Sequence, residues 1–324
     1  MMNWGILAPG RIARKFTADL KHVPGARLIA VGSRSHERAL AFASEFGVPN
    51  AYGSYAELVA DPTVDVIYIA SPHSEHFEHV MLCLEAGKPV LCEKAFAFNT
   101  REVREMTAFA REQGVFLMEA LWTRLNPGTL KALELIEAGV IGDVVHLTAD
   151  FGFRADYNPS SRLFDPKLAG GSLYDIGLYP LLISKLVLGV PEEIRAVGTL
   201  TETGVDMNCS MALRFAGGAT ATLFSTFAAK TDTSCTIYGS KGKLFLQSRF
   251  QETTGLTIIP EDGEPESLSV ERIGFGYAYE ARHVEECLRE GLIESPLLPH
   301  SFSIELMESM EEVRRQMGVR YPGD

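Results

Sequence analysis

The chain has 324 residues, of which 46% are apolar and 22% are charged, a composition that excludes collagen-like and intrinsically disordered proteins. Its 42 acidic residues outnumber 30 basic ones and give a formal net charge of −12. A surface of that sign repels phosphate, so we expect no nucleic-acid partner. At roughly 150 residues per domain, the length suggests about two domains.

The apolar runs and the cysteines indicate where in the cell the protein is expected. No uninterrupted apolar run approaches the roughly 18 residues that a membrane helix requires, so we expect no membrane partner. The apolar stretch at residues 4–8 follows no basic residue and is too short for a signal sequence. The cysteines are odd in number, lack a C-x-x-C pair and stand at positions 83, 92, 209, 235 and 287. They are typical of reduced thiols, and we expect a cytoplasmic protein.

The first 120 residues alternate short apolar runs with helical stretches. The expected strands lie at 3–8, 26–32, 64–70, 89–92 and 115–118, and the expected helices at 11–20, 35–46, 55–59, 74–86 and 100–113. Such alternation indicates βαβ units. The sequence therefore predicts an α/β Rossmann domain, a doubly wound parallel sheet, over residues 1–120.

The rest of the chain, 121–324, has a different rhythm. Helices are expected at 128–138, from 173, at 277–290 and at 301–317, and strands at 143–153, 193–201, 207–215, 219–228, 233–238 and 243–248. Consecutive strands without intervening helices favour antiparallel pairing. The sequence predicts an α+β domain with a large, mainly antiparallel open sheet, and its last helix is a candidate to pack back on the first domain.

The first strand runs into the turn Ala8-Pro9-Gly10-Arg11-Ile12-Ala13. This turn stands where dinucleotide-binding proteins carry G-x-G-x-x-G/A, and a pyrophosphate then faces the N-terminus of the following helix. The candidate cofactor contacts are Ala8, Gly10, Arg11 and Ile12. A tight turn without a ligand is the alternative interpretation.

The end of the second strand bears on the choice of cofactor. An NAD site usually places Asp or Glu about 20 residues after the glycine turn, but residues 20–36 include no acidic residue. They include Ser33 and Arg34, and Arg38 follows one helical turn later. Because a guanidinium can bind a 2′-phosphate, we predict NADP(H) rather than NAD(H). Solvated surface charges are the alternative for both arginines.

Polar residues follow the next two strands. The carboxyl ends of parallel strands line the ligand crevice of a doubly wound sheet, so we expect residues there to reach the nicotinamide. These residues are Ser71, Pro72, His76, Glu93 and Lys94. The spacing of His73, His76 and His79 superficially suggests a metal site. Helical geometry spreads them too widely for a tetrahedral ligand set, and we predict no metal.

Four separate motifs carry a family resemblance. They are EKA at 93–95, MEALWTR at 118–124, GGSLYDIGLYP at 170–180 and GVRYP at 318–322. Together they resemble the glucose–fructose oxidoreductase/inositol dehydrogenase (Gfo/Idh/MocA) family, and within it the branch of dimeric dihydrodiol dehydrogenases and NADP-dependent xylose dehydrogenases. Two residues depart from the family pattern, since proline is usual at Ala95 and glycine at Ala8.

The resemblance implies a function and a site. Lys94, Asp175 and Tyr179 would be catalytic, hydride would move between NADP(H) and a sugar, a sugar-derived carbonyl or a vicinal dihydrodiol, and the antiparallel sheet would form a homodimer. Trp122 resembles a substrate-pocket tryptophan of this branch. Three further aromatic residues are candidates for that pocket and Arg162 for cofactor or substrate binding, the aromatics being Phe151, Phe153 and Tyr157.

The chemistry of the catalytic set is reasonable from the residues alone. A tyrosine has a pKa of about 10, and an ammonium about 4 Å away stabilises its anion by about 4 kcal/mol at an effective dielectric near 20. Tyr179 would then serve as the acid or base, assisted by Lys94 and Asp175. Each has a simpler alternative: Ser172-x-x-Asp175 matches a capping box, Tyr179 could be a core aromatic, and Lys94 an exposed lysine.

Two other functions stay open. A regulator on the same fold would sense NADP without turnover, although it would have no need for a proton donor. A sugar–sugar oxidoreductase would keep NADP tightly bound between two half-reactions.

Overall fold

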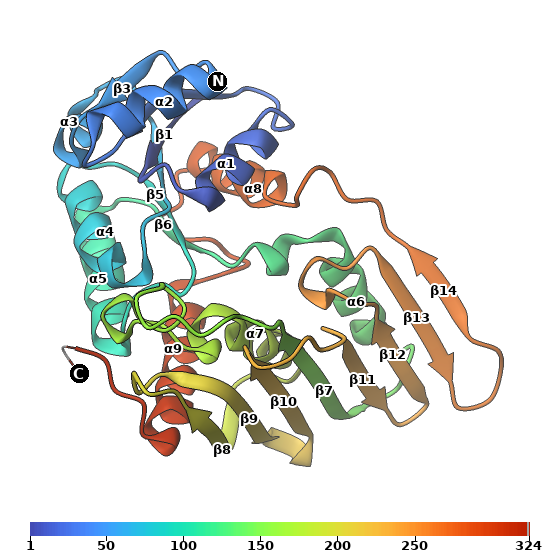
Figure 1. Cartoon of the computed structure of the whole chain (residues 1–324). Coiled ribbons are helices and arrows are strands. Elements are labelled where there is room, and N and C mark those ends of the chain that lie inside the picture. Colours follow the sequence, from blue (N-terminus) through green and yellow to red (C-terminus); the bar gives the residue numbers. More distant parts are fainter. Residues whose placement is uncertain (323) are drawn as a thin grey trace. The chain divides into compact units, whose positions relative to one another are not determined.

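The computed structural model describes residues 1–322 and 324, and it divides into two compact units (Figure 1). Unit 1 comprises Met1–Trp122 and Ile273–Ile304, and unit 2 comprises Thr123–Arg272 and Glu305–Asp324. The chain therefore leaves unit 1, builds most of unit 2, returns to unit 1 and ends in unit 2. A single division at residue 120 does not include that return.

Unit 1 is built on a six-stranded sheet in the order β3-β2-β1-β4-β5-β6, with every pair parallel. The strands are β1 (Met2–Leu7), β2 (Ala26–Gly32), β3 (Asn50–Tyr52), β4 (Val66–Ile69), β5 (Val90–Glu93) and β6 (Leu117–Ala120). All residues of β4, β5 and β6 are buried, as expected when helices cover both faces of a sheet. The predicted doubly wound parallel sheet is confirmed.

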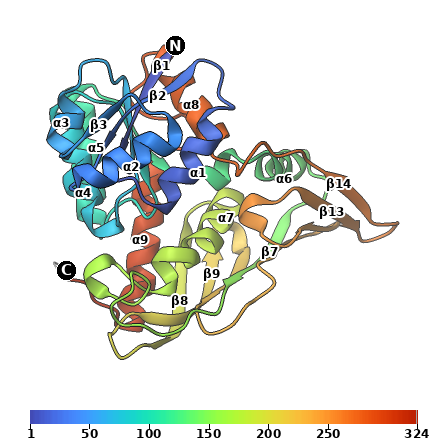
Figure 2. The same cartoon turned by 45° about the horizontal axis from the view of Figure 1, so that its top comes forward.

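Helices flank this sheet, and one of them, α8, comes from the segment 273–304 that returns to unit 1. They are α1 (Arg11–Leu20), α2 (His36–Phe46), α3 (Tyr55–Ala60), α4 (His76–Glu85), α5 (Thr100–Gln113) and α8 (Ala278–Arg289). Helix α8 lies beside α1 (Figure 2). Asp19, at the end of α1, accepts backbone N–H groups of Phe275 and Tyr277 at 2.9 and 2.8 Å. The Trp4 indole donates to Glu285 on α8. These bonds hold residues 273–289 in unit 1.

Unit 2 is built on an eight-stranded sheet in the order β14-β13-β12-β11-β7-β10-β9-β8. The strands are β7 (Val144–Gly152), β8 (Pro191–Leu200), β9 (Asp206–Phe215), β10 (Thr220–Thr226), β11 (Cys235–Gly239), β12 (Gly242–Leu246), β13 (Gly255–Pro260) and β14 (Glu266–Ser269). Every pair is antiparallel except β7 with β10. The predicted, mainly antiparallel sheet is confirmed, with β13 and β14 added at one edge.

Helices cover one face of this sheet. Unit 2 contains α6 (Pro127–Glu137), a π-helix (Leu173–Gly177), α7 (Leu178–Leu188) and most of α9 (His300–Met317). Helix α7 and the π-helix pack against β7 and β10 (Figure 1). Register aligns Leu147, Ile237 and Leu244 on the covered face, and all three are fully buried. This apolar layer is the core of unit 2.

One segment of unit 2 is long and apolar. By length and composition alone, Pro166–Leu188 could cross a membrane, but 78% of its most apolar 18-residue stretch is buried within the protein. The prediction from sequence concerned uninterrupted apolar runs, and this segment contains polar residues. Its burial fits the core helix of a globular domain, which can be as long and as apolar as a membrane span.

Candidate active site

The turn after β1 has an unusual backbone. Ala8 adopts a φ of +69°, which lies in the left-handed region. This conformation costs a residue with a Cβ roughly 1–2 kcal/mol, and the family that the sequence resembles usually has glycine at this position. The Gly10 amide donates to the Ala8 carbonyl at 2.8 Å. The strand–turn–helix context of a dinucleotide site is therefore present, and Ala8 adopts the conformation that a glycine would adopt.

Gly10 provides a test of whether the turn fits a pyrophosphate. Its φ is −87°, which any residue adopts, and the nearest atoms to a Cβ placed there are carbonyl oxygens at 3.8 Å (Ala70) and 4.0 Å (Ala8). Nothing in the protein itself therefore requires glycine. Gly10 precedes Arg11 and Ile12 in the first turn of α1, whose N-terminus has no side-chain cap. A glycine that the protein's own packing does not require, next to a helix N-terminus without a side-chain cap, fits the binding of an anionic group.

Gly10→Ala should therefore leave folding nearly intact and weaken cofactor binding. We expect a change in unfolding free energy below about 1 kcal/mol, the cost of Ala at an N-cap. The dissociation constant for NADP⁺ should rise at least about tenfold, because a methyl group would occupy the approach to the backbone. Chemical denaturation and fluorescence titration measure the two quantities. An unchanged dissociation constant would contradict the assignment of this turn.

The predicted 2′-phosphate residues lie at the end of β2 and the start of α2. Ser33 is buried, and its hydroxyl accepts the Ser35 amide. The Arg34 side chain is 72% exposed and forms an ion pair with Glu75 at 3.0 Å. Arg38 is exposed in the first turn of α2. Both guanidinium groups are thus at the surface of unit 1.

The loop after β5 carries Lys94 and is held from several sides. The Tyr68 hydroxyl donates to Glu93, whose other carboxyl oxygen accepts the Lys94 amide at 3.3 Å. The Lys94–Ala95 peptide is cis. His76 has one ring nitrogen 2.9 Å from the Ala95 carbonyl oxygen and the other 2.9 Å from that of Ser71.

His76 thus joins the loop after β4 to the loop after β5. Burial lowers its pKa to about 4, so the ring is neutral and donates to only one of the two carbonyls. His76 would contribute to a cofactor site indirectly, by holding these two loops, the first of which includes Ser71 and Pro72. His79 bonds the Ser71 hydroxyl at 2.8 Å. Within the described residues, no group of three His, Cys, Asp or Glu side chains is arranged to hold a metal ion.

The segment that bears Asp175 begins as a π-helix, whereas the sequence predicts a regular helix capped by Ser172. The Ser172 hydroxyl makes no cap; it donates to the buried Asp206 carboxylate at 2.7 Å. Asp206 also accepts the Leu173 amide at 2.8 Å. Pro180 has no N–H, so the regular ladder cannot pass through it, and π-turns are frequent at functional sites. The capping-box alternative is wrong because Asp206 already binds these donors.

Gly171 explains the glycine pair before this helix. Its φ is +115°, and a Cβ there would lie 2.2 Å from Asp206. The preceding Gly170 carbonyl accepts the hydroxyl of Tyr321, from the GVRYP motif, at 2.6 Å. Gly171 lets the chain approach Asp206 closely, and the hydrogen bond from Tyr321 joins the C-terminal segment to Gly170.

Asp175, Tyr179 and Arg162 all belong to unit 2. Arg162 forms an ion pair with Asp175 at 3.0 Å. The Tyr179 ring is 7% exposed and lies 5.6 Å from the ring of Phe151. Asp175 lies in the π-helix and Tyr179 in α7. Because a π-turn is wider than an α-turn, residues four apart need not share one face here.

The remaining aromatic candidates fall into two groups. Phe153 packs on Phe227, and Tyr157 on Phe164, with ring centroids 5.1 Å apart in each pair. Trp122 belongs to unit 1, where it is buried and packs on Tyr277 at 4.9 Å. Unit 2 thus gathers three of the four predicted pocket residues on the same segment of chain.

The structure distributes the predicted catalytic set over both units. Unit 1 brings the phosphate turn, the arginines and Lys94 to the carboxyl ends of one sheet, and unit 2 brings Asp175 and Tyr179 to the start of α7. The sequence analysis gave no role to Glu119, a buried carboxylate in the apolar strand β6. A charged residue inside a fully buried strand is the signal that could have found it.

Comparisons with known proteins agree with this arrangement. Residues 2–121 match the profile of an oxidoreductase family with an NAD-binding Rossmann fold, and residues 129–245 match the GFO/IDH/MocA C-terminal domain. The chain belongs to the GFO/IDH/MocA oxidoreductase family. The family assignment made from the four motifs is thereby confirmed.

Relatives of this family member are dehydrogenases and reductases. It is 41% identical to mouse trans-1,2-dihydrobenzene-1,2-diol dehydrogenase, a match covering 100% of this chain and 99% of the mouse protein. The 3-ketoreductase KijD10 of Actinomadura kijaniata, solved with NADP and TDP-benzene, matches with a TM-score of 0.87 and 26% identity, covering 98% of both chains. A levoglucosan dehydrogenase, solved with NADH and levoglucosan, shares the fold with a TM-score of 0.89, 20% identity and coverage of 98% and 97%. This family member is an NAD(P)-binding oxidoreductase of the sugar and dihydrodiol dehydrogenase type.

Proposed function

We propose that the protein is an NADP(H)-dependent oxidoreductase that moves hydride between nicotinamide and a sugar, a sugar-derived carbonyl or a vicinal dihydrodiol. The observation that carries this proposal is the full-length relation to a dihydrodiol dehydrogenase. Two features of the chain support it. The packing of the protein itself does not require a glycine at position 10. Asp175 lies in the π-helix whose start is held by buried hydrogen bonds, and Tyr179 follows it in α7.

The proposed proton transfer uses Tyr179. When bound, NADP(H) supplies or accepts the hydride at the substrate carbon. In the reduction direction, the Tyr179 hydroxyl gives its proton to the carbonyl oxygen, and in oxidation its anion takes the hydroxyl proton. The ammonium of Lys94 stabilises that anion, and Asp175, paired with Arg162, orients the substrate hydroxyl.

The preference for the phosphorylated cofactor rests on Arg34 and Arg38. In the Arg34–Glu75 pair the arginine side chain is 72% exposed and the glutamate side chain 22%, and ion pairs at the protein surface contribute about 0–1 kcal/mol. A 2′-phosphate forms charge-assisted bonds of about 1.5–3 kcal/mol with a guanidinium and would therefore displace Glu75. Residues 20–36 offer no carboxylate to the ribose of NAD.

A substrate panel tests the proposed function. Absorbance at the NADPH band would be followed with aldoses, osone-like dicarbonyls and a dihydrodiol, with NADH as the matched control. We expect turnover with at least one of these classes and a kcat/KM at least about tenfold higher with NADPH, as one charge-assisted bond predicts. Equal use of NADH would contradict the role of the arginines. Cofactor that stays bound through gel filtration would instead favour a sugar–sugar oxidoreductase.

We also propose a homodimer through the uncovered face of the eight-stranded sheet. Strand register aligns small side chains across that face in the order Ala212, Thr222, Thr148, Thr236 and Thr257, interrupted by one Phe245. Rows of small side chains on one face suit packing of one sheet on another. Val197, on the same face, is 70% exposed, which favours an apolar partner surface.

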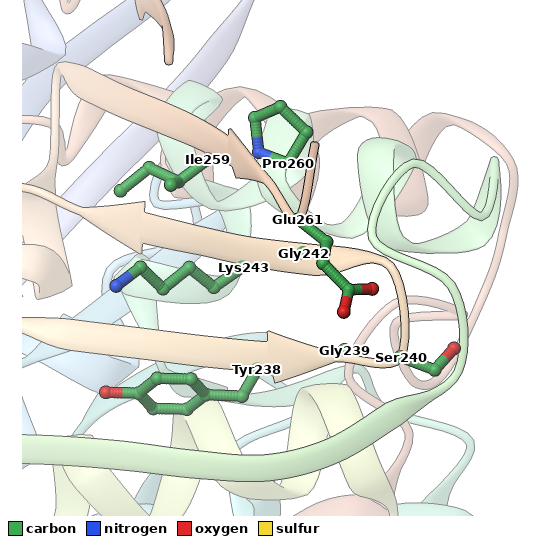
Figure 3. A pocket seen from close by; sticks show the side chains of 8 residues that line it. All are labelled: Tyr238, Gly239, Ser240, Gly242, Lys243, Ile259, Pro260 and Glu261. Carbon is green, nitrogen blue, oxygen red and sulfur yellow. The ribbon is translucent and has the colours of Figure 1, made fainter. Parts of the chain in front are cut away.

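The edge of this face is hollowed. Tyr238, Lys243 and Ile259 lie side by side on β11, β12 and β13 and border an open hollow of about 300 Å³ (Figure 3). In a symmetric dimer this hollow would receive side chains of the second copy. Sedimentation equilibrium of the chain should give the mass of two copies, and a monomer at all concentrations would refute the dimer.

A further inference from the structure

The loop that carries Lys94 is held by hydrogen bonds at three of its residues, Glu93, Ala95 and Phe96. Tyr68 bonds Glu93, and His76 bonds the Ala95 carbonyl. At the next residue, the backbone N–H of Phe96 donates to the carboxyl group of Glu119. Glu119 is therefore the anchor on the far side of Lys94 and the only one of the three with an ionisable carboxyl group.

Glu119 comes from the neighbouring strand and is almost completely enclosed. It lies on β6 directly beside Cys92 of β5 in the register of the sheet, and its side chain is 3% exposed. Its carboxyl group accepts a second hydrogen bond, from the Ser303 hydroxyl on α9. Burying an ionised carboxylate costs free energy unless hydrogen bonds and an opposite charge compensate it. Glu119 has two hydrogen-bond donors.

The charged groups that face Glu119 have opposing effects. Glu93 and Lys94 approach from the end of β5, and Cys92 lies beside it with a thiol whose pKa is raised by burial. Beyond Glu93 lies Glu280 on α8, whose two carboxyl oxygens have no hydrogen-bond partner within the described residues. Burial, followed by Glu93 and Asp19, raises the pKa of Glu280 well above its usual range, which favours its neutral form.

Glu119 itself titrates near neutrality. Burial raises its pKa to about 7, with a further upward contribution from Glu93, while Ser303, the Phe96 amide and Lys94 favour the ionised form. The ionised form accepts both hydrogen bonds at full strength and attracts the ammonium of Lys94. The protonated form has lost that charge.

We propose that Glu119 is a positioning residue for Lys94, which holds the 94–96 loop through the Phe96 amide and places a negative charge behind the ammonium. This inference rests on the proposed function for its effect on turnover, but the contacts belong to unit 1 alone. Glu119 touches neither substrate nor cofactor in this scheme. It acts through the loop.

Stability against pH tests the contacts without any activity. The folded protein holds the Glu119 proton more tightly than the unfolded chain does, so the unfolding free energy should decline as pH rises from about 4.5 to 7. Urea unfolding of wild type and Glu119→Gln should show a steeper decline for wild type. The matched control is Glu285→Gln, which removes another buried carboxyl of unit 1, bonded to Trp4 and Arg289.

Turnover against pH tests the positioning role. Wild-type kcat should rise through about pH 7 as Glu119 ionises, whereas Glu119→Gln should lack that rise, with kcat about tenfold lower at pH 8 and the cofactor KM within about twofold. Ser303→Ala removes a bond that favours the ionised form and should move the rise to higher pH. Glu285→Gln should keep the wild-type profile.

The outcomes separate the two proposals. If Glu119→Gln keeps the wild-type profile and kcat, the positioning role is refuted. If that variant does not fold, Ser303→Ala decides, and an unmoved profile refutes the role. A wild-type protein without turnover on any substrate refutes the proposed function, while the stability series would still report whether Glu119 has the predicted charge.

Discussion

Tyr179→Phe should lower kcat by about 10²–10⁴-fold, the usual contribution of a positioned acid or base, and leave the dissociation constant of NADP⁺ within about twofold. The substitution removes only the hydroxyl. The ring would still pack 5.6 Å from Phe151 in its nearly buried position, so folding should be preserved. Steady-state assays and fluorescence titration of the same preparation measure both quantities.

Tyr174→Phe is the matched control for this loss. Tyr174 lies on the π-helix that precedes α7, is fully buried and donates to the Met307 sulfur at 3.4 Å. Because that bond is weak and the residue has no proposed role in proton transfer, kcat should stay within about threefold of wild type. Turnover near the wild-type rate in Tyr179→Phe would remove its role as the acid or base.

Asp206→Ala should destabilise the protein by about 2–4 kcal/mol, because it leaves the buried Leu173 amide without its acceptor and the Ser172 hydroxyl with only Ser225 as its partner. The lost bonds hold the start of the π-helix that leads to Asp175 and Tyr179. We therefore expect kcat to fall as well, even under conditions where the variant is folded. Urea unfolding and assays at low denaturant separate the two effects.

Asp206→Asn is the conservative partner of that variant. It keeps an oxygen for both donors, so its loss of stability should be smaller than that of Asp206→Ala. Burial raises the pKa of Asp206, so the wild type loses stability as pH rises past the ordinary carboxyl range. The Asn variant should lack that decline. Equal losses in the Ala and Asn variants would show that the hydrogen bonds are not what holds the helix.

Local patterns were sufficient to predict much of the fold. Apolar runs such as residues 64–70, followed by helical periodicity, predict parallel βαβ units because both faces of each strand must be covered. Consecutive strands without intervening helices, such as 207–215 and 219–228, predict antiparallel pairing. Both sheets of the structure agree with these predictions.

Other parts of the fold depend on contacts distant in sequence. Strands β3 and β14 are short edge strands whose composition hardly differs from that of a loop. The return of 273–289 to unit 1 depends on Asp19 and Glu285, which bind groups more than 250 residues away. No local pattern encodes such pairings.

The candidate site divides in the same way. The turn after the first strand predicts a role for Gly10, and the family resemblance implies roles for Lys94 and Tyr179. Neither anticipated that Asp206 binds the start of the π-helix or that Glu119 supports the loop of Lys94. Those roles follow from burial, which a single sequence does not show.

A crystal structure with NADP⁺ and a polyol substrate tests the central claim most directly. We predict that the Lys94 ammonium and the Tyr179 hydroxyl both lie within about 3.2 Å of one substrate oxygen, with the nicotinamide ring stacked against the carbon that bears it. A nicotinamide bound far from both residues, or a substrate oxygen that meets neither, would contradict the account.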